Sequence, residues 1–223
     1  ATELDRSEDF GYKNNKLGFS IGSTFEYLND LNFGVSTSSY YEKIETNSSA
    51  SVRQQAQEGN YWDTFGILNF DYDKRNQKFK PSEGFRSTYS IQTPIISENN
   101  TLTNTYNHKY YTNLFENNVT SFSIFLQSAN SITSDDIKLS ERLNIPSNKL
   151  RGFERGKVGP KDGNDFIGGN YVTSFNATTN IPQLFQNFQN LDLSLFFDAA
   201  NVWGIDYDSS LNDGSKIRSS IGV

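Results

Sequence analysis

The residues able to carry out chemistry are few in this chain, and their spacing decides what each can do. The segment Asp162-Gly163-Asn164-Asp165 offers the oxygen ligands that calcium prefers, but it lacks the EF-hand spacing and the closing glutamate. Asp-Gly is above all a turn dipeptide. The sequence therefore favours a turn over a metal site here, and we expect no metal.

Two further candidates concern acid–base and nucleophilic chemistry. Asp71 and Asp73 share one face of an expected strand, but paired carboxylates need a substrate cleft before they act as general acid and base. We expect them to be solvated charges that face a lumen. His108 is the only histidine, and no nucleophile elbow accompanies it. No glycine run has the spacing of a phosphate-binding loop. We therefore predict that the protein is not an enzyme and uses no catalytic residue and no cofactor.

The elements that must position these residues are indicated by alternating apolar and polar side chains. From Leu17 to Tyr27 the odd positions are mostly apolar and the even positions are small or polar. A period of two over this length predicts a strand with one apolar face. Asn29-Asp30 then makes a tight turn and Leu31 restarts the alternation, which predicts a hairpin. Similar segments recur at 61–74, 84–97, 105–116, 120–131, 168–181 and 190–203, and a ninth begins at Lys216.

The connections between these segments broadly alternate between short and long. Asn29-Asp30 and Asn117-Asn118 are tight turns, whereas the connections at 46–60 and 132–167 are long. Strands of about ten residues with short turns on one side and long loops on the other are typical of an outer-membrane barrel. A soluble antiparallel sandwich also alternates, but the small polar face of 17–27 suits a wet lumen better than a packed core. The pattern favours the membrane barrel and leaves the sandwich open.

Composition narrows the classes of protein further. The chain has 223 residues, a net charge of −6, no cysteine and no methionine. The acidic balance argues against nucleic acid as a partner, and disulfides neither hold the chain together nor indicate its compartment. No signal peptide is visible, and no apolar run is long enough for a transmembrane helix. We interpret the chain, which opens on Ala1-Thr2-Glu3, as an excised or processed piece.

Motifs in this chain resemble the barrel domain of the BamA family, whose members insert and assemble outer-membrane β-barrels. The motifs are, in order, Leu150-Arg151-Gly152-Phe153, Val158-Gly159-Pro160, Gly168-Gly169-Asn170 and Phe196-Phe197-Asp198-Ala199-Ala200-Asn201-Val202-Trp203. Asp73-Lys74-Arg75-Asn76 with Pro81-Ser82-Glu83-Gly84, and the segment 217–222, match as well. The likeness covers most of the chain from about Asn60 onward, and the residues before it match only in strand pattern.

The resemblance implies an all-β fold, namely part of an antiparallel transmembrane β-barrel with about eight complete strands and the start of a ninth, out of roughly sixteen. Residues 1–223 would belong to one C-terminal outer-membrane β-barrel domain, and the POTRA domains of family members are absent from this chain. The implied function is to fold and insert other β-barrel proteins into the outer membrane of a Gram-negative bacterium. Implied partners are outer-membrane lipid, client outer-membrane proteins and accessory lipoproteins, and client strands would enter through a seam that lies outside this chain.

Two alternative functions stay open. A two-partner secretion transporter belongs to the same superfamily and shares the Arg-Gly-Phe loop, but it exports an unfolded protein through the lumen. A plain diffusion porin has the same strand alternation. A porin gives no reason for an arginine on a long loop that is matched to an aspartate on a strand.

The resemblance singles out the loop motif Arg151-Gly152-Phe153 together with Asp198. Alternation along the last long strand places Asp198 on the lumen face. A guanidinium in a narrow lumen needs a fixed acceptor, and its planar fork suits a carboxylate. We therefore predict that the loop 132–167 folds back inside the barrel with Arg151 bonded to Asp198. Gly152 would allow an unusual backbone path, and Phe153 would pack against the inner wall.

Three further expectations concern single positions and faces. In relatives an acidic residue also faces the loop arginine, and Thr178 stands at that place here, which leaves Asp198 as the main charged partner. Trp62 and Trp203 near strand ends are either interfacial anchors or packing residues. Two apolar stripes should meet lipid because soluble monomers do not tolerate such patches; their residues are Leu17, Phe19, Ile21 and Phe25, and Leu191, Leu193, Leu195 and Phe197.

Overall fold

One antiparallel sheet of ten strands dominates the computed structural model, which describes residues 2–6, 11–98, 100–116, 118–133, 136–181, 193–206, 211 and 216–223. The strands follow the order β1-β2-β3-β4-β5-β6-β7-β10-β11-β12 across the sheet. Their bounds are β1 Thr2–Arg6, β2 Tyr12–Leu28, β3 Leu31–Thr46, β4 Gly59–Asp73, β5 Gly84–Ile96, β6 Thr101–Thr112, β7 Thr120–Ser131, β10 Tyr171–Ile181, β11 Leu193–Trp203 and β12 Arg218–Gly222. The remaining elements are α2 Val52–Gln55, the 3₁₀ turn η1 Leu139–Glu141, and a small hairpin of β8 Lys161–Asp162 and β9 Asp165–Phe166.

This architecture confirms the predicted all-β fold, because β2 to β7, β10 and β11 are the eight complete strands and β12 is the beginning of a ninth. The short strand β1 was not predicted. β6 begins at Thr101 rather than at 105, because Thr101 pairs with Ser131 and Thr103 pairs with Gln92, so both neighbouring strands extend it. The expected strand residues 190–192, the turn residue Asn117 and the stripe residue Leu191 lie outside the described residues.

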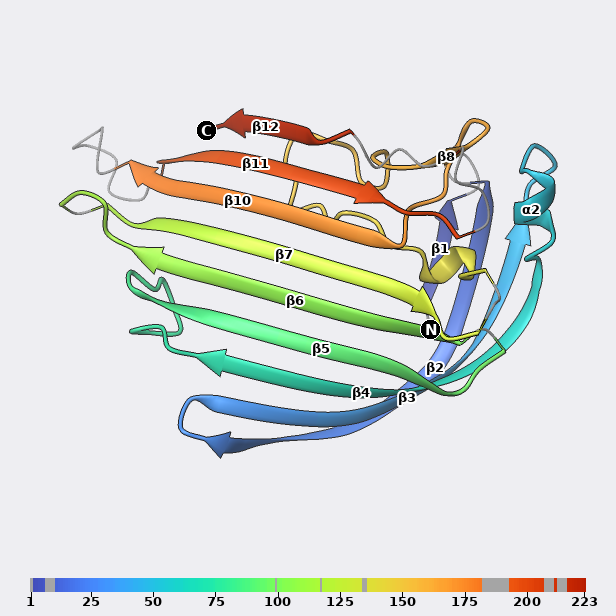
Figure 1. The fold of residues 1–223 in the computed structure, drawn as a ribbon, viewed down its shortest axis with the longest axis horizontal. Coiled ribbons are helices and arrows are strands. Elements are labelled where there is room, and N and C mark those ends of the chain that lie inside the picture. Colours follow the sequence, from blue (N-terminus) through green and yellow to red (C-terminus); the bar gives the residue numbers. More distant parts are fainter. Residues whose placement is uncertain are drawn as a thin grey trace.

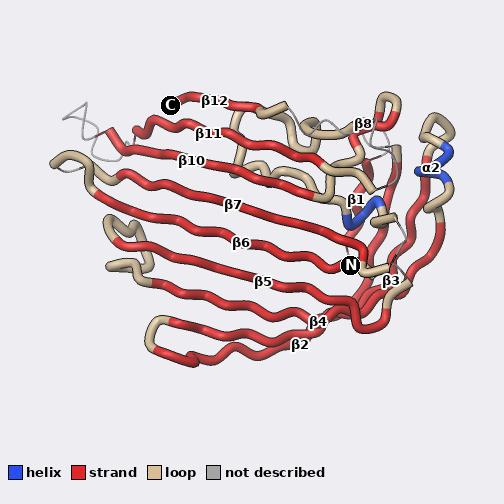
Figure 2. Tube along the Cα trace, in the orientation of Figure 1, coloured by secondary structure: helices blue, strands red, loops and turns tan. Residues whose placement is uncertain are grey.

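The sheet is strongly curved, and β2, β3 and β4 bend away from the others at the end of the molecule that carries α2 (Figure 1). We call this the loop end, and the opposite end, with the Asn29-Asp30 turn, the turn end. Because the strands are antiparallel, the connections 47–58 and 132–170 both belong to the loop end (Figure 2). The connection 132–170 starts there and then runs along one face of β10 and β11.

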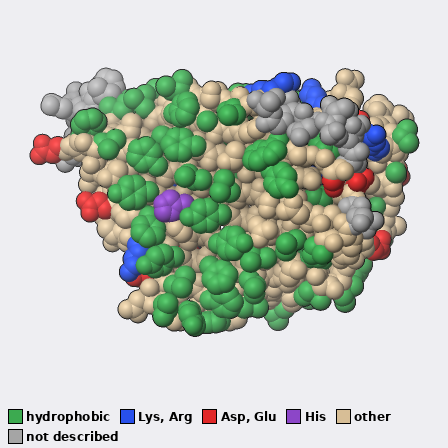
Figure 3. Space-filling view, in the orientation of Figure 1, with side chains coloured by type: hydrophobic (Ala, Val, Ile, Leu, Met, Phe, Trp, Pro, Cys, Tyr) green, Lys and Arg blue, Asp and Glu red, His purple; other side chains and the backbone are tan. Residues whose placement is uncertain are grey.

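Apolar side chains cover the other face of the sheet (Figure 3). Phe19 and Ile21 on β2 are 65% and 68% exposed, and Leu195 and Phe197 on β11 are each 43% exposed. Exposed apolar side chains also lie on the strands between these two, among them Val35, Leu68, Tyr106 and Leu126. Soluble monomers rarely expose a contiguous apolar surface of this extent. The described part of the chain contains no helix with the length and hydropathy needed to cross a bilayer.

The hydrophobic core lies between the connection 132–170 and the inner face of β7, β10 and β11. Leu150 of the connection is 2% exposed, and Val172 and Val202 of the wall are 1% and 0% exposed. The full cluster is Phe125, Ala129, Ile137, Leu143, Ile145, Leu150, Val158, Val172, Ala200 and Val202. The long connection is therefore a packed layer against the sheet, because its own apolar residues and small wall residues fill the space between them.

The strands β2, β3 and β4 are longer than their neighbours, with 17, 16 and 15 residues. A tilted strand needs only about 9–11 residues to cross a bilayer. Their surplus length forms the bent part at the loop end, where Tyr12 and Ile44 are buried with Leu139 of the connection. This bend brings β2 to β4 within reach of the start of the connection 132–170.

Candidate functional site

Arg151 and Asp198 form the centre of the site that the sequence singled out. Arg151 donates from Nε to Asp198 Oδ2 at 2.7 Å and from Nη2 to Oδ1 at 2.7 Å, and its backbone N–H donates to Oδ2 at 3.0 Å. The Asp198 carboxylate is 0% exposed, whereas the Arg151 side chain is 34% exposed. The two side-chain contacts form a bidentate ion pair, the strongest form of arginine–carboxylate pairing.

Three wall residues complete this site, which we call the arginine clamp. Asn176 donates to Asp198 Oδ1 at 2.8 Å, and Thr178 Oγ accepts from Arg151 Nη2 at 3.2 Å. The Phe196 ring centre lies 3.7 Å from Arg151 Cζ, close enough for a cation–π contact. Asn176 pairs directly with Asp198 across β10 and β11, and Thr178 pairs with Phe196, so two neighbouring cross-strand pairs build the site. Thr178 does stand beside the arginine, while Asn176 and Phe196 were not singled out from sequence.

Gly152 and Phe153 occupy different surroundings from one another. Gly152 has φ +80°, a backbone conformation that favours glycine, although a Cβ there would meet only Ser220 at 3.9 Å. Its conformation, rather than close packing, therefore calls for glycine. Phe153 is 37% exposed and lines a small cavity formed by its own connection, with Ile145 and Val158 among the neighbours. The aromatic ring that contacts the motif from the wall is Phe196 instead.

A second cation of the connection, Arg142, is bonded to the segment that follows β11. The Arg142 side chain is 0% exposed and donates from Nη2 to Asp206 Oδ1 at 2.6 Å and from Nη1 to Asn170 Oδ1 at 3.3 Å. Asp206 Oδ2 also accepts the backbone N–H of Ile137 at 2.6 Å. These contacts hold the start of the connection against the segment that follows β11.

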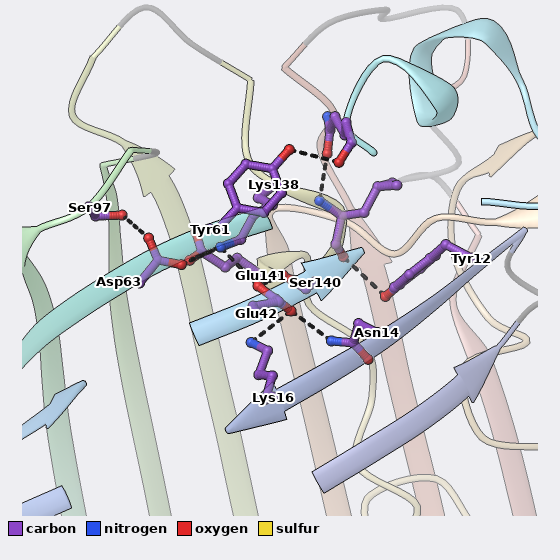
Figure 4. Close-up of polar contacts among 12 residues, drawn as sticks. Tyr12, Asn14, Lys16, Glu42, Tyr61, Asp63, Ser97, Lys138, Ser140 and Glu141 are labelled. Atoms are coloured by element: carbon purple, nitrogen blue, oxygen red, sulfur yellow. Dashed lines mark hydrogen bonds and ion pairs between the residues drawn. The ribbon is translucent and has the colours of Figure 1, made fainter. Parts of the chain in front are cut away.

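A third cation, Lys138, lies in a buried cluster that no sequence pattern indicates (Figure 4). Lys138 Nζ lies 2.9 Å from Glu42 Oε2 on β3, donates to Asp63 Oδ2 on β4, and lies 3.6 Å from Glu141 Oε1. The side chains of Lys138, Glu42 and Asp63 are all 0% exposed. We call Lys138, Glu42, Asp63 and Glu141 the lysine cluster.

Polar neighbours satisfy most of the lysine cluster. Glu42 also accepts from Asn14 Nδ2 at 2.7 Å and from Ser140 Oγ at 2.9 Å, and Lys16 Nζ lies 3.2 Å from Glu42 Oε1. Ser97 Oγ donates to Asp63 Oδ1 at 2.6 Å. The Glu141 carboxyl is the most weakly paired member, since Lys138 lies no closer than 3.6 Å and its other polar neighbour is the Thr101 hydroxyl.

Burial and charge act in opposite directions on the pKa values in this cluster. Burial alone lowers the pKa of Lys138, but the carboxylates of Glu141, Glu42 and Asp63 outweigh it, so the pKa lies above its ordinary value. Burial raises the pKa of the Glu141 carboxyl, and nearby Lys138 offsets this only in part. Lys138 therefore stays a charged ammonium, and the Glu141 carboxyl holds a proton more readily than an exposed glutamate does.

Lys149, two residues before Arg151, reaches β6 and β7, and no carboxylate of the described residues lies at bonding distance from it. Its Nζ donates to Asn107 Oδ1 at 2.7 Å and to Ser123 Oγ at 3.2 Å, and it lies 5.4 Å from the Phe125 ring centre. Burial lowers the pKa of Lys149, and the positive charge of Lys109 lowers it further.

The remaining sequence candidates do not join these sites. The expectation that Asp71 and Asp73 are merely solvated charges was incomplete: Arg86 donates to Asp71 at 2.8 and 2.7 Å, and Arg75 donates to Asp73 at 2.7 and 2.6 Å. A planar guanidinium on a neighbouring strand or turn explains each pair. Both pairs line a polar cavity of about 480 Å³ at the turn end.

His108 is partly buried on β6 and forms a cross-strand pair with Ser87, whose Oγ is 2.7 Å from Nδ1. The Phe85 ring lies 5.6 Å away from the imidazole. Asp162 and Asp165 bracket the turn of the β8–β9 hairpin, as the Asp-Gly dipeptide predicted. No group of three or more histidine, aspartate or glutamate side chains able to hold a metal occurs in the described part of the chain.

The tryptophans near strand ends differ in their contacts. Trp62 on β4 is 53% exposed, whereas Trp203 on β11 stacks on Tyr171 with ring centres 5.6 Å apart. Trp203 thus packs against its neighbour strand at the loop end, and Trp62 remains free to act as an interfacial anchor.

A curved antiparallel sheet with exposed apolar stripes on one face and an arginine-clamped connection on the other is the wall of a transmembrane β-barrel. The Omp85 superfamily domain matches residues 2–223, so the chain belongs to the Omp85 superfamily. No curated protein matches the chain.

Among solved structures, the chain is similar to BamA from Haemophilus ducreyi lacking POTRA domains 1–3. The TM-score is 0.83 at 20% sequence identity, over 95% of this chain and 48% of that chain. The likeness confirms the predicted BamA-type barrel fold, and the chain spans about half the length of that structure. At this identity the match concerns the fold.

Proposed function

We propose that the protein to which this chain belongs folds and inserts other β-barrel proteins into the outer membrane of a Gram-negative bacterium, in the manner of BamA. Membership of the Omp85 superfamily supports a role in outer-membrane protein assembly or translocation. The observation that carries the finer proposal is the connection 132–170, which is packed and bonded against the inner face of the wall and would have to move aside for export through the lumen.

The chain's own residues act by position and carry out no covalent chemistry in this proposal. The outward stripes place the wall in lipid, with Phe19 and Leu195 on the exposed face. The clamp, the Arg142–Asp206 pair and the lysine cluster hold the connection 132–170 as a rigid inner layer. A rigid inner layer keeps the wall in one curvature while a client strand pairs elsewhere on the barrel. The proposed partners are outer-membrane lipid, client outer-membrane proteins and accessory lipoproteins, and neither nucleic acid nor a cofactor is involved.

Two-partner secretion is the second candidate, because the Omp85 superfamily match covers that class as well. One observation bears on the choice. The connection is packed on the wall through Leu150, Val158 and other apolar residues, and it is bonded there by three cations. Export through the lumen would require this layer to move aside, whereas insertion of clients at the barrel wall would not. The family match gives no support to the plain diffusion porin.

Assembly in a reconstituted system tests the proposal. The full-length protein in liposomes should increase the yield of a folded, protease-resistant client barrel, and Arg151→Ala and Asp198→Ala should lower that yield. Arg155→Ala is the matched control, because Arg155 lies on the same connection and is exposed. Passage of an unfolded passenger across the bilayer with no gain in client folding would instead establish secretion. Unchanged client yield in both clamp variants would remove the clamp from the mechanism.

A further inference from the structure

The lysine cluster joins parts of the sheet that do not touch each other directly. Lys138 belongs to the connection after β7, whereas Glu42 and Asp63 belong to β3 and β4. In the sheet order β5 and β6 separate β4 from β7. Because the sheet is curved, the connection spans the concave side and meets the bent ends of β3 and β4 (Figures 1 and 4). The cluster is thus a cross-link between two regions of the wall.

Because this cluster is buried, breaking the cross-link while its charges stay buried costs much free energy. Lys138, Glu42 and Asp63 are all 0% exposed, so removing the ammonium would leave two buried carboxylates without their cation. Loss of one partner from a buried ion pair is strongly destabilising for this reason. The Tyr61 ring lies 4.7 Å from Lys138 Nζ, and Gln57 Oε1 accepts the backbone N–H of Leu139 at 2.7 Å. These contacts fix the same short segment from the β3–β4 side.

The charges of the cluster do not balance if every carboxyl is ionised. Among the described residues, Lys138 is the fully buried cation that contacts Glu42 and Asp63, and Lys16 reaches Glu42 from a position that is 27% exposed. Glu42 and Asp63 already form ion pairs with these two cations at short distance. Glu141 lies farther from Lys138, at 3.6 Å, and its other polar neighbour is the uncharged hydroxyl of Thr101, so Glu141 is the surplus carboxyl.

A protonated Glu141 would resolve this surplus. A neutral carboxyl carries one O–H donor, and the Glu141 carboxyl faces the buried Thr101 hydroxyl, which can accept from a protonated carboxyl as well as donate to an ionised one. Burial raises the pKa of Glu141, which agrees with this assignment. The titratable and charged groups that surround Glu141 are Lys16 of β2, Tyr40 and Glu42 of β3, Asp63 of β4 and Lys138 of the connection.

We propose that the lysine cluster is a latch that holds the connection 132–170 closed against β3 and β4, and that the closed latch carries one proton on Glu141. Opening exposes Glu141 to water, where it ionises at its ordinary pKa. The closed latch therefore binds one proton more than the open latch over the range between the two pKa values. It is most stable on the acid side of that range and weakens as the pH rises through it.

Amide hydrogen exchange of residues 137–143 in the full-length protein, in detergent micelles, tests the latch directly. Protection is corrected for the intrinsic exchange rate at each pH. In the wild type it should fall as the pH rises, by up to about tenfold per pH unit, the limit for release of one proton. Glu141→Gln mimics the neutral carboxyl, so protection should stay high and lose this pH dependence. Glu154→Gln on the same connection is the control, because the Glu154 side chain is 66% exposed and its partner Lys157 is only partly buried.

Lys138→Met tests the cross-link itself and should lower protection of 137–143 at every pH. Equal pH dependence in the wild type and Glu141→Gln would overturn the proton on Glu141. Protection in Lys138→Met within about twofold of the wild type would overturn the latch, since a buried pair of this kind is worth far more than the corresponding 0.4 kcal/mol or so. If Lys138→Met does not fold, the comparison of wild type with Glu141→Gln still decides the proposal. The readout is exchange rather than client assembly, so failure of the latch is distinct from failure of the proposed function.

Discussion

The arginine clamp is asymmetric, and the asymmetry gives a quantitative prediction. Asp198 is 0% exposed and Arg151 is 34% exposed, so the two partners depend on each other to different degrees. Without the guanidinium, the donors that the described residues leave to the Asp198 carboxylate are Asn176 Nδ2 and the backbone N–H of residue 151. Arg151→Met should therefore destabilise the closed connection by about 3–5 kcal/mol, the range for an uncompensated buried charge.

The reverse change should cost less. In Asp198→Asn the side chain keeps its shape, and the partly exposed guanidinium of Arg151 remains hydrated on one side. The loss is then that of charge-assisted hydrogen bonds, about 1.5–3 kcal/mol. Because both changes remove the same contact, the double variant should cost about 2 kcal/mol less than the sum of the single variants.

Native-state hydrogen exchange at the amide of residue 151 is the assay, because this N–H itself donates to Asp198 Oδ2 at 3.0 Å. A loss of about 3 kcal/mol corresponds to a rise in the opening equilibrium of roughly a hundredfold. Arg155→Met serves as the control for loss of a cation from the connection. Equal effects of Arg151→Met and Asp198→Asn, or an effect of Arg151→Met no larger than that of Arg155→Met, would refute the asymmetric clamp.

Three other outcomes are expected from the structure. Thr178→Val removes one hydrogen bond to Arg151 and should cost about 1 kcal/mol in the same exchange assay. A cost as large as that of Arg151→Met would show that Thr178 contributes as much to the clamp as the ion pair does. Gly84→Ala should lower the denaturant midpoint far more than Gly163→Ala, because φ is positive at both but a Cβ at 84 would lie 2.1 Å from Lys74 O and one at 163 meets nothing within 4 Å. Burial lowers the pKa of Lys149 below 10.5, so between the lowered pKa and 10.5 the unfolded chain binds more protons than the folded one. The free energy of unfolding of the wild type, minus that of Lys149→Met, should therefore rise with pH over this range. A difference that stays constant with pH would contradict the lowered pKa.

The sequence by itself determined the strands and the direction of their side chains. Alternation over 17–27 predicted one apolar and one polar face, because successive side chains on a strand point to opposite sides whatever the strand packs against. The same rule placed Asp198 on the inner face, and the resemblance of the loop motif supplied Arg151 as its partner. These are local or motif-level properties, and the structure shows the two side chains bonded.

The tertiary structure alone decided which distant residues meet. Glu42 and Asp63 follow the inward alternation of their strands, but nothing in the chain indicates that their partner is Lys138, which lies 75 positions beyond Asp63 in an aperiodic connection. Their meeting depends on the curvature of the sheet and on the surplus length of β2 to β4, which accumulate over many residues. The exposure of Phe153 and the contact of Phe196 with Arg151 were decided in the same way, because the path of a long connection is set by the wall it packs against rather than by its own sequence.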